Sequence, residues 1–99
     1  MSHQLRFTKA ALADIERLYR FLADRDIPTA EAALHALEKA WELLGTFPFA
    51  ARKADPSNPF LRELLIPFGG AGYVALFEIE DDTTLTILAV RHQREDDYH

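Results

Sequence analysis

At 99 residues the chain has the size of one domain, and its content of 48% apolar and 27% charged residues excludes an intrinsically disordered protein. The chain contains no cysteine, which excludes disulfides and thiolate metal sites and favours a reducing compartment, the cytoplasm. The net charge of −5 argues against strong direct binding to nucleic acid, because such binding requires basic residues that neutralise phosphates. No stretch reads as a signal peptide or a membrane span, so we expect one cytoplasmic domain over residues 1–99 and no membrane contact.

A short strand followed by an amphipathic helix is expected at the N-terminus. Leu5 and Phe7 alternate with polar residues, which is typical of a half-buried strand, and the Thr8 hydroxyl can cap a helix that follows. Apolar residues then recur at helical spacing from about Lys9 to Ala23, at Ala11, Ile15, Leu18 and Leu22.

A second helix is expected after a break at residues 24–29. Pro28 disfavours helix at the residue before it but fits the first turn of the next helix, and Gly45 followed by Pro48 predicts the stop. The short link predicts an antiparallel helical hairpin. The apolar stripe of this helix comprises Ala30, Leu34, Leu37, Trp41 and Leu44, so Trp41 is interpreted as a core residue.

The C-terminal half is expected to form a loop followed by three strands. Residues 47–59 are rich in proline and small residues and show no period, which predicts a loop. The strands are expected at Phe60 to Phe68, Tyr73 to Glu80 and Leu85 to His92. The predicted order is β-α-α-β-β-β.

Both faces of this sheet are predicted to be apolar. Two helices can cover one face only, so the other face is expected to be covered by the long loop, by self-association into a homodimer, or by another protein. We infer a habitual protein partner. Alternation places Tyr73, Ala75, Phe77 and Ile79 opposite to Val74 and Leu76, and it places Leu85, Ile87 and Ala89 opposite to Leu88 and Val90.

Several charged and aromatic residues are candidates for a binding site. Arg62 lies in an apolar strand row and needs a carboxylate or phosphate, with an ion pair such as one to Glu78 as the plain interpretation. Basic residues at the end of the last strand could join it in binding phosphate or an acidic protein surface, with a solvated chain end as the alternative. These residues are Arg91, His92 and Arg94, and the partner anchors or helix-end caps are Phe47 and Phe49.

Two motifs are interpreted as structural rather than chemical. The glycine-rich segment 69–72 precedes a strand and lacks the following Lys-Ser/Thr of a phosphate loop, so it predicts a hairpin turn. The histidines at 3, 35, 92 and 99 lack the spacing of ligands on one helix face. No metal and no cofactor are therefore expected.

Taken in order, five segments of the chain resemble the ParE/RelE superfamily of toxins from bacterial type II toxin–antitoxin systems, which includes ParE-like plasmid stabilisation proteins. No segment is specific alone, but the ordered set is. The segments are FTKAALADI at 7–15, LLGTFP at 43–48, FLR at 60–62, GYVALFE at 72–78 and RHQR at 91–94.

The resemblance implies an α+β fold in which a helical hairpin packs on a small, mainly antiparallel sheet. It also implies a cytoplasmic bacterial toxin held inactive by a cognate antitoxin, whose extended segment and helix wrap around it. ParE-like members act on DNA gyrase, whereas RelE-like members cleave messenger RNA on the ribosome. Cleavage would need a base, an acid and cations, for which Arg62, Arg91, His92 and Tyr98 are the candidates.

The charge balance favours a ParE-like gyrase inhibitor that is not an enzyme. The long loop holds only Arg52 and Lys53 as basic residues, fewer than a ribosome-directed nuclease is expected to carry. The alternatives are a RelE-like ribosome-dependent endoribonuclease and an inactive member that binds only the antitoxin. The predicted contacts to gyrase or antitoxin are Arg62, Arg91, His92, Arg94, Tyr98, Phe47 and Phe49.

Overall fold

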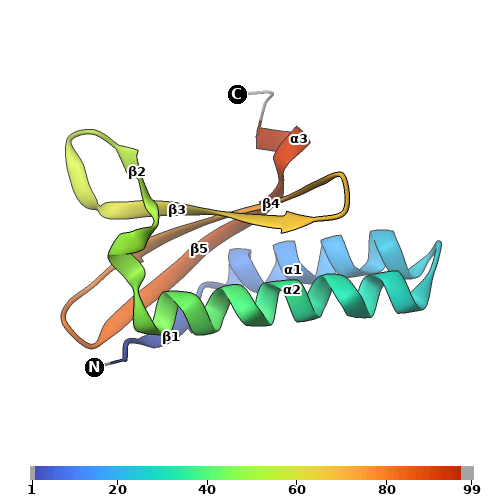
Figure 1. The fold of residues 1–99 in the computed structure, drawn as a ribbon, viewed down its shortest axis with the longest axis horizontal. Helices are drawn as coiled ribbons and strands as arrows, with labels where there is room; N and C mark the ends of the chain where they lie inside the picture. The colour runs from blue at the N-terminus through green and yellow to red at the C-terminus, as the bar shows by residue number, and fades with distance from the viewer. Residues whose placement is uncertain (1, 97–99) are drawn as a thin grey trace.

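A computed structural model describes residues 2–96 and shows two helices packed on one face of a five-stranded sheet (Figure 1). The strand order is β1-β5-β4-β3-β2, with β1 parallel to β5 and the other neighbours antiparallel. The predicted α+β arrangement is therefore confirmed. The elements are β1 Gln4–Phe7, α1 Lys9–Ala23, α2 Ile27–Thr46, the 3₁₀ turn η1 Pro48–Ala50, β2 Arg52–Asp55, β3 Asn58–Phe68, β4 Ala71–Ile79, β5 Thr84–His92 and α3 Gln93–Asp96.

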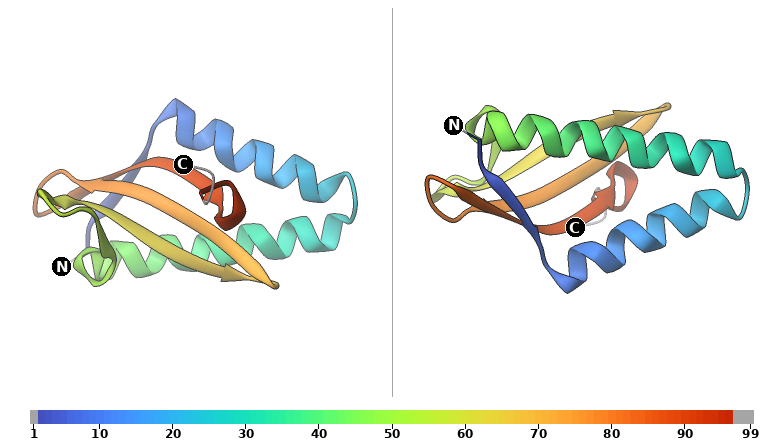
Figure 2. Two further views of the ribbon diagram at one scale, coloured as in Figure 1. Left: turned by 90° about the horizontal axis from the view of Figure 1, so that it is seen from above. Right: turned by 90° about the horizontal axis from the view of Figure 1, so that it is seen from below.

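The two long helices form the predicted hairpin, and β1 runs from the end of α2 to the start of α1 (Figure 2). Helix α1 has the predicted bounds, and Pro28 lies in the first turn of α2 as expected. The predicted stop between Gly45 and Pro48 is confirmed, because α2 ends at Thr46, but Gly45 itself lies inside the last turn rather than just after the helix. Gly45 instead permits close packing: a Cβ there would lie 3.4 Å from the His3 carbonyl oxygen, and the His3 N–H donates to the Gly45 carbonyl at 2.5 Å.

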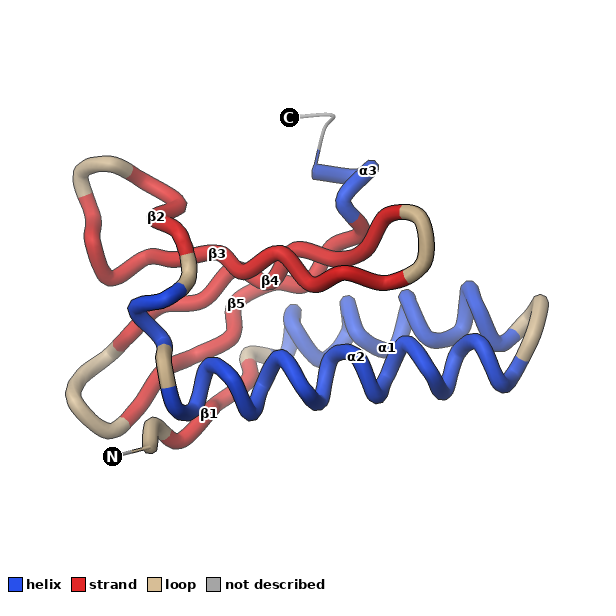
Figure 3. The backbone as a smooth tube through the Cα atoms, viewed as in Figure 1, coloured by secondary structure: helices blue, strands red, loops and turns tan. Residues whose placement is uncertain are grey.

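The predicted loop at residues 47–59 contains the turn η1 and the strand β2 (Figure 3). This strand was missed because four residues are too few to show a period, and cross-strand contacts define it instead. Arg52 Nε donates to Glu63 Oε1 at 2.7 Å, and the Asp55 carboxylate accepts from the Ser57 N–H and hydroxyl, both at 2.9 Å. These two hydrogen bonds lower the pKa of Asp55 from its usual value.

One extra residue in β5 changes which side chains enter the core. Neighbouring residues of β4, Leu76 and Phe77, pair with Ala89 and Ile87, so Leu88 has no opposite residue and forms a bulge. The prediction that Ala89 shares a face with Ile87 is therefore wrong. Val90 takes that place and is fully buried, whereas Leu88 and Ala89 are half-buried.

The outer face of the sheet, opposite to the two long helices, is only partly covered. Figure 1 shows α3 on this side, where it contacts β4, and Gly72 and Val74 of that strand are buried. Leu65 on the same face stays 45% exposed. The predicted apolar outer face therefore exists, and part of it is covered by the chain's own C-terminal turn. No helix among the described residues is long and apolar enough to cross a membrane.

Gly72 is a position that only glycine can occupy. Its φ of 142° lies outside the range of ordinary residues, and a Cβ would approach the Ile66 carbonyl oxygen to 2.2 Å and Gln93 Nε2 to 3.0 Å. Gly70, two residues earlier in the same hairpin, has no positive φ and has nothing within 4 Å of a Cβ. The turn therefore tolerates a side chain at one glycine and not at the other.

We expect Gly72→Ala to lower the free energy of unfolding by about 1–3 kcal/mol or more, through backbone strain and the clash with Ile66. The matched variant Gly70→Ala should change it by less than about 0.5 kcal/mol. Urea denaturation of both variants checks this. Equal losses in the two variants would contradict the assignment.

Candidate functional site

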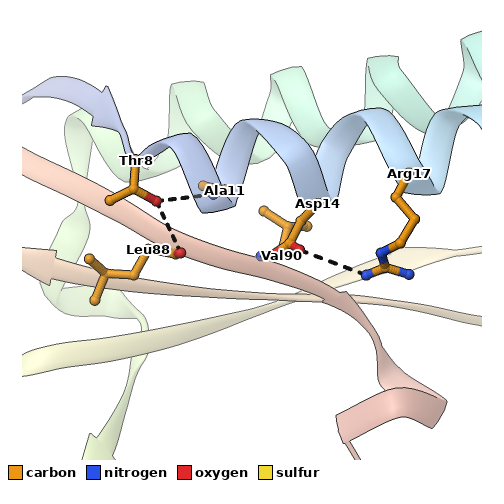
Figure 4. A network of polar contacts seen from close by, with 6 residues as sticks. All are labelled: Thr8, Ala11, Asp14, Arg17, Leu88 and Val90. Atoms are coloured by element: carbon orange, nitrogen blue, oxygen red, sulfur yellow. Dashed lines mark hydrogen bonds and ion pairs between the residues drawn. The ribbon is translucent and has the colours of Figure 1, made fainter.

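The end of β5, which carries Arg91 and His92, is fixed by side chains from the start of α1 (Figure 4). Strand β1 accompanies β5 only as far as Ile87, whose carbonyl accepts from the Thr8 N–H at 3.1 Å. Beyond that point helix α1 takes the place of a neighbouring strand. The Thr8 hydroxyl caps α1 by accepting from the Ala11 N–H at 3.0 Å and lies 3.2 Å from the Leu88 carbonyl oxygen, to which it donates.

Asp14 completes this arrangement. Its Oδ2 accepts a hydrogen bond from the Val90 N–H at 3.0 Å, and its Oδ1 lies 3.9 Å from an Arg17 nitrogen. Val90 is fully buried, and a buried N–H without an acceptor costs about 1–3 kcal/mol. Asp14 was not among the residues predicted from the sequence. Its one visible signal is a carboxylate on the half-buried side of an amphipathic helix.

Arg91 and His92 follow directly and lie on opposite faces of the sheet, because successive strand residues alternate. Arg91 is exposed and pairs with Val74 on the outer face. His92 pairs with Tyr73, and their rings meet edge to face at 5.9 Å. The His92 Nδ1 lies 3.1 Å from the Arg94 N–H, which fixes the ring against the turn into α3. Arg94, three residues after Arg91, is exposed on α3, and Figure 1 shows α3 on the outer side of the sheet.

Tyr73 is the aromatic support under this site. It is only 3% exposed, and its ring stacks on Phe68 with centroids 5.9 Å apart. Burial raises the pKa of the Tyr73 hydroxyl above its usual value of 10.0, because the phenolate loses its hydration. This side chain is therefore a neutral packing group for His92 at physiological pH.

Arg62 lies apart from the end of β5. It lies in the predicted apolar row and pairs with Phe77 of β4, whereas Arg91 pairs with Val74. These two partners are three residues apart along β4, which is about 10 Å at strand spacing. Its guanidinium donates to backbone carbonyls of Pro59 at 2.7 Å, of Ala51 at 2.8 Å and of Phe49 at 3.4 Å. Backbone oxygens, rather than a carboxylate or phosphate, satisfy this charge.

The two predicted aromatic anchors form part of an exposed aromatic patch beside Arg62. Phe47 and Phe49 are 60% and 52% exposed, and Phe49 meets Phe60 edge to face at 6.3 Å. The Arg62 guanidinium lies 5.1 Å from the centre of the Phe49 ring. Arg62 thus orders the turn that carries this patch. Tyr98, the last candidate residue, lies outside the described part of the chain.

A groove between α2 and β3 was not predicted. Strand β2 pairs with β3 only up to Glu63, so β3 has an open edge from Leu64 to Phe68. The groove beside this edge has a volume of about 430 Å³, and Leu43 and Leu65 on its walls are 44% and 45% exposed. Small side chains of α2 make the groove possible: Ala32, Ala36 and Ala40. Among the described side chains, which end at Arg94, no three lie together as metal ligands would.

Comparison with known proteins identifies one family and several similar solved structures. The family model described as "ParE toxin of type II toxin-antitoxin system, parDE" matches residues 5–97. A structure of the chromosomal ParDE system of P. aeruginosa is similar, with a TM-score of 0.72, 18% identity, and 92% of this chain and 96% of that chain covered. The RelBE2 toxin–antitoxin complex of Mycobacterium tuberculosis is similar with a TM-score of 0.61, 26% identity, and coverage of 93% and 99%. No curated protein sequence matches.

The raised pKa of Tyr73 predicts a loss of stability in alkali. The folded state holds the Tyr73 proton more tightly than the unfolded state does, so the free energy of unfolding should fall as pH rises above about 10. In Tyr73→Phe the free energy of unfolding should fall less steeply with pH, as measured by urea denaturation between pH 8 and pH 11. Tyr19→Phe on α1 is the control for removing a hydroxyl. An alkaline slope in Tyr73→Phe equal to that of the wild type would refute the prediction.

Proposed function

Because the chain belongs to the ParE toxin family of type II toxin–antitoxin systems, we propose that it inhibits DNA gyrase and is neutralised in the cytoplasm by a cognate antitoxin. The family match over residues 5–97 carries the proposal, since it favours the ParE-like target over the ribosome. Two exposed basic residues are the proposed contacts to gyrase, Arg91 at the end of β5 and Arg94 on α3.

The arrangement of the candidate residues supports a toxin that acts by binding. RNA cleavage needs a base, an acid and cations around one phosphate. Here the Arg62 guanidinium donates to three backbone carbonyls, and it lies about 10 Å along the sheet from the position of Arg91. Arg91 and His92 lie on opposite faces of the sheet. His92 is also engaged through Nδ1 by the Arg94 N–H. The similarity to the RelBE2 complex makes RNA cleavage the second candidate, so it is tested in parallel.

The groove between α2 and β3 is the proposed antitoxin site. An open strand edge offers backbone hydrogen bonds to an extended segment, and an apolar groove beside it receives that segment's side chains. Exposed Leu43 and Leu65 supply the apolar contacts, while Lys39 and His35 on the α2 wall favour an acidic segment. The exposed aromatic patch of Phe47, Phe49 and Phe60 continues from the end of α2 and is a second proposed contact for a partner.

Purified toxin should inhibit supercoiling by gyrase. The double variant Arg91→Ala/Arg94→Ala should reach half-inhibition only at a toxin concentration at least about tenfold higher, which corresponds to a loss of ~1.4 kcal/mol in binding free energy. The double variant Arg20→Ala/Arg25→Ala, which removes two exposed arginines from the end of α1 and the turn after it, is the charge-matched control and should inhibit like the wild type. Primer extension on translated messages runs alongside. Cuts in the message without gyrase inhibition would replace this proposal with the endoribonuclease.

Ala36→Glu should weaken antitoxin binding about tenfold or more, because it places a carboxylate in the apolar groove. The matched variant Ala10→Glu adds the same charge in the exposed first turn of α1, where a carboxylate suits the helix dipole. Calorimetry with the co-expressed antitoxin measures both. Unchanged affinity in Ala36→Glu would show that the antitoxin binds elsewhere.

A further inference from the structure

We infer that Asp14, supported by Thr8, is the positioning residue for the basic end of β5, so that helix α1 controls how this end is presented to the target. The inference rests on the proposed function in one respect, the role of Arg91 and Arg94 as target contacts. It goes beyond that function by assigning a task to a carboxylate that touches neither the target nor the antitoxin groove.

The geometry begins with a strand that runs past its neighbour. Strand β5 continues to His92, whereas its parallel neighbour β1 ends at Phe7, so the last part of β5 has no strand on that side. A bulge at Leu88 lies where the neighbour ends. A bulge bends a strand and increases its local twist, so the direction of the following residues has to be fixed by something else.

Two side chains at the start of α1, its N-cap Thr8 and Asp14 in the second turn, provide that fixation (Figure 4). The Thr8 hydroxyl donates to the carbonyl of the bulged residue Leu88 at 3.2 Å. Asp14 accepts from the Val90 N–H at 3.0 Å, with its side chain 24% exposed. A hydrogen bond to a charged acceptor in a largely dry position is stronger than one between neutral groups.

The residue held by Asp14 immediately precedes Arg91. Val90 is fully buried and points toward the helices, so alternation sends Arg91 to the outer face and His92 back to Tyr73. A slip of one residue at the bulge would exchange the faces of Arg91 and His92. Asp14 therefore determines which side chain the target meets, although it lies on the other side of the sheet.

The test compares Asp14→Ala with Asp14→Asn, whose side-chain oxygen can still accept from the Val90 N–H. In Asp14→Ala, amide hydrogen exchange at Val90 should accelerate about tenfold or more, and the toxin concentration for half-inhibition of gyrase should rise by a similar factor. Antitoxin affinity should stay near the wild-type value. Asp14→Asn should restore both measurements toward the wild type.

Ile79→Val, a buried change at the far end of β4, is the control for lost stability alone. The two variants are compared at temperatures that give them the same free energy of unfolding. Under these conditions Ile79→Val should inhibit gyrase at the same toxin concentration as the wild type. Equal loss of inhibition in both variants, or wild-type exchange at Val90 in Asp14→Ala, would overturn the inference. If the wild-type toxin does not inhibit gyrase, only the proposed function fails. The inference is then decided by hydrogen exchange at Val90 and by the NMR chemical shifts of Arg91 and His92 in Asp14→Ala.

Discussion

The hydrogen bond between the Val90 N–H and the Asp14 carboxylate is the constraint on which the rest of the sheet depends. β5 lies between β1 and β4, but β1 is four residues long, so half of β5 would leave its buried backbone groups unpaired on one side. Helix α1 takes that place, which requires the chain to turn directly from β1 into α1 at Thr8. The position of α1 and the course of β5 therefore depend on each other.

This arrangement gives the two sheet faces different roles. The inner face is closed by α1 and α2 around large buried side chains such as Phe77 and Ile87. The outer face carries α3, the exposed Arg91 and the exposed Leu65, and it ends in the open edge of β3. Because the molecule has a net charge of −5, an acidic partner has to be recognised by such a local basic region rather than by the overall field.

The sequence predicted features set by local periods and missed those set by pairing between distant segments. The bounds of α1 follow from helical spacing and the Thr8 cap, and the strand row containing Arg62 follows from alternation. The bulge at Leu88 has no local signal, because an extra residue exists only relative to the partner strand. The carbonyl partners of Arg62 were equally invisible, since every residue carries a backbone oxygen. Arg62 and Arg91 were expected to lie close together on neighbouring strands. The register separates them, because Arg62 pairs with Phe77 and Arg91 pairs with Val74.

The register also explains how one partner could cover both proposed surfaces. Leu65, Val74 and Arg91 form a single row across β3, β4 and β5, and all three lie on the outer face. At strand spacing the row is about 10 Å wide, roughly three residues of extended chain. A segment seated against the open edge of β3 is thus separated from Arg91 by the buried Val74 and by α3 on the same face. A partner that covers both proposed surfaces therefore has to pass over or displace α3, which contacts β4 and β5 on this face.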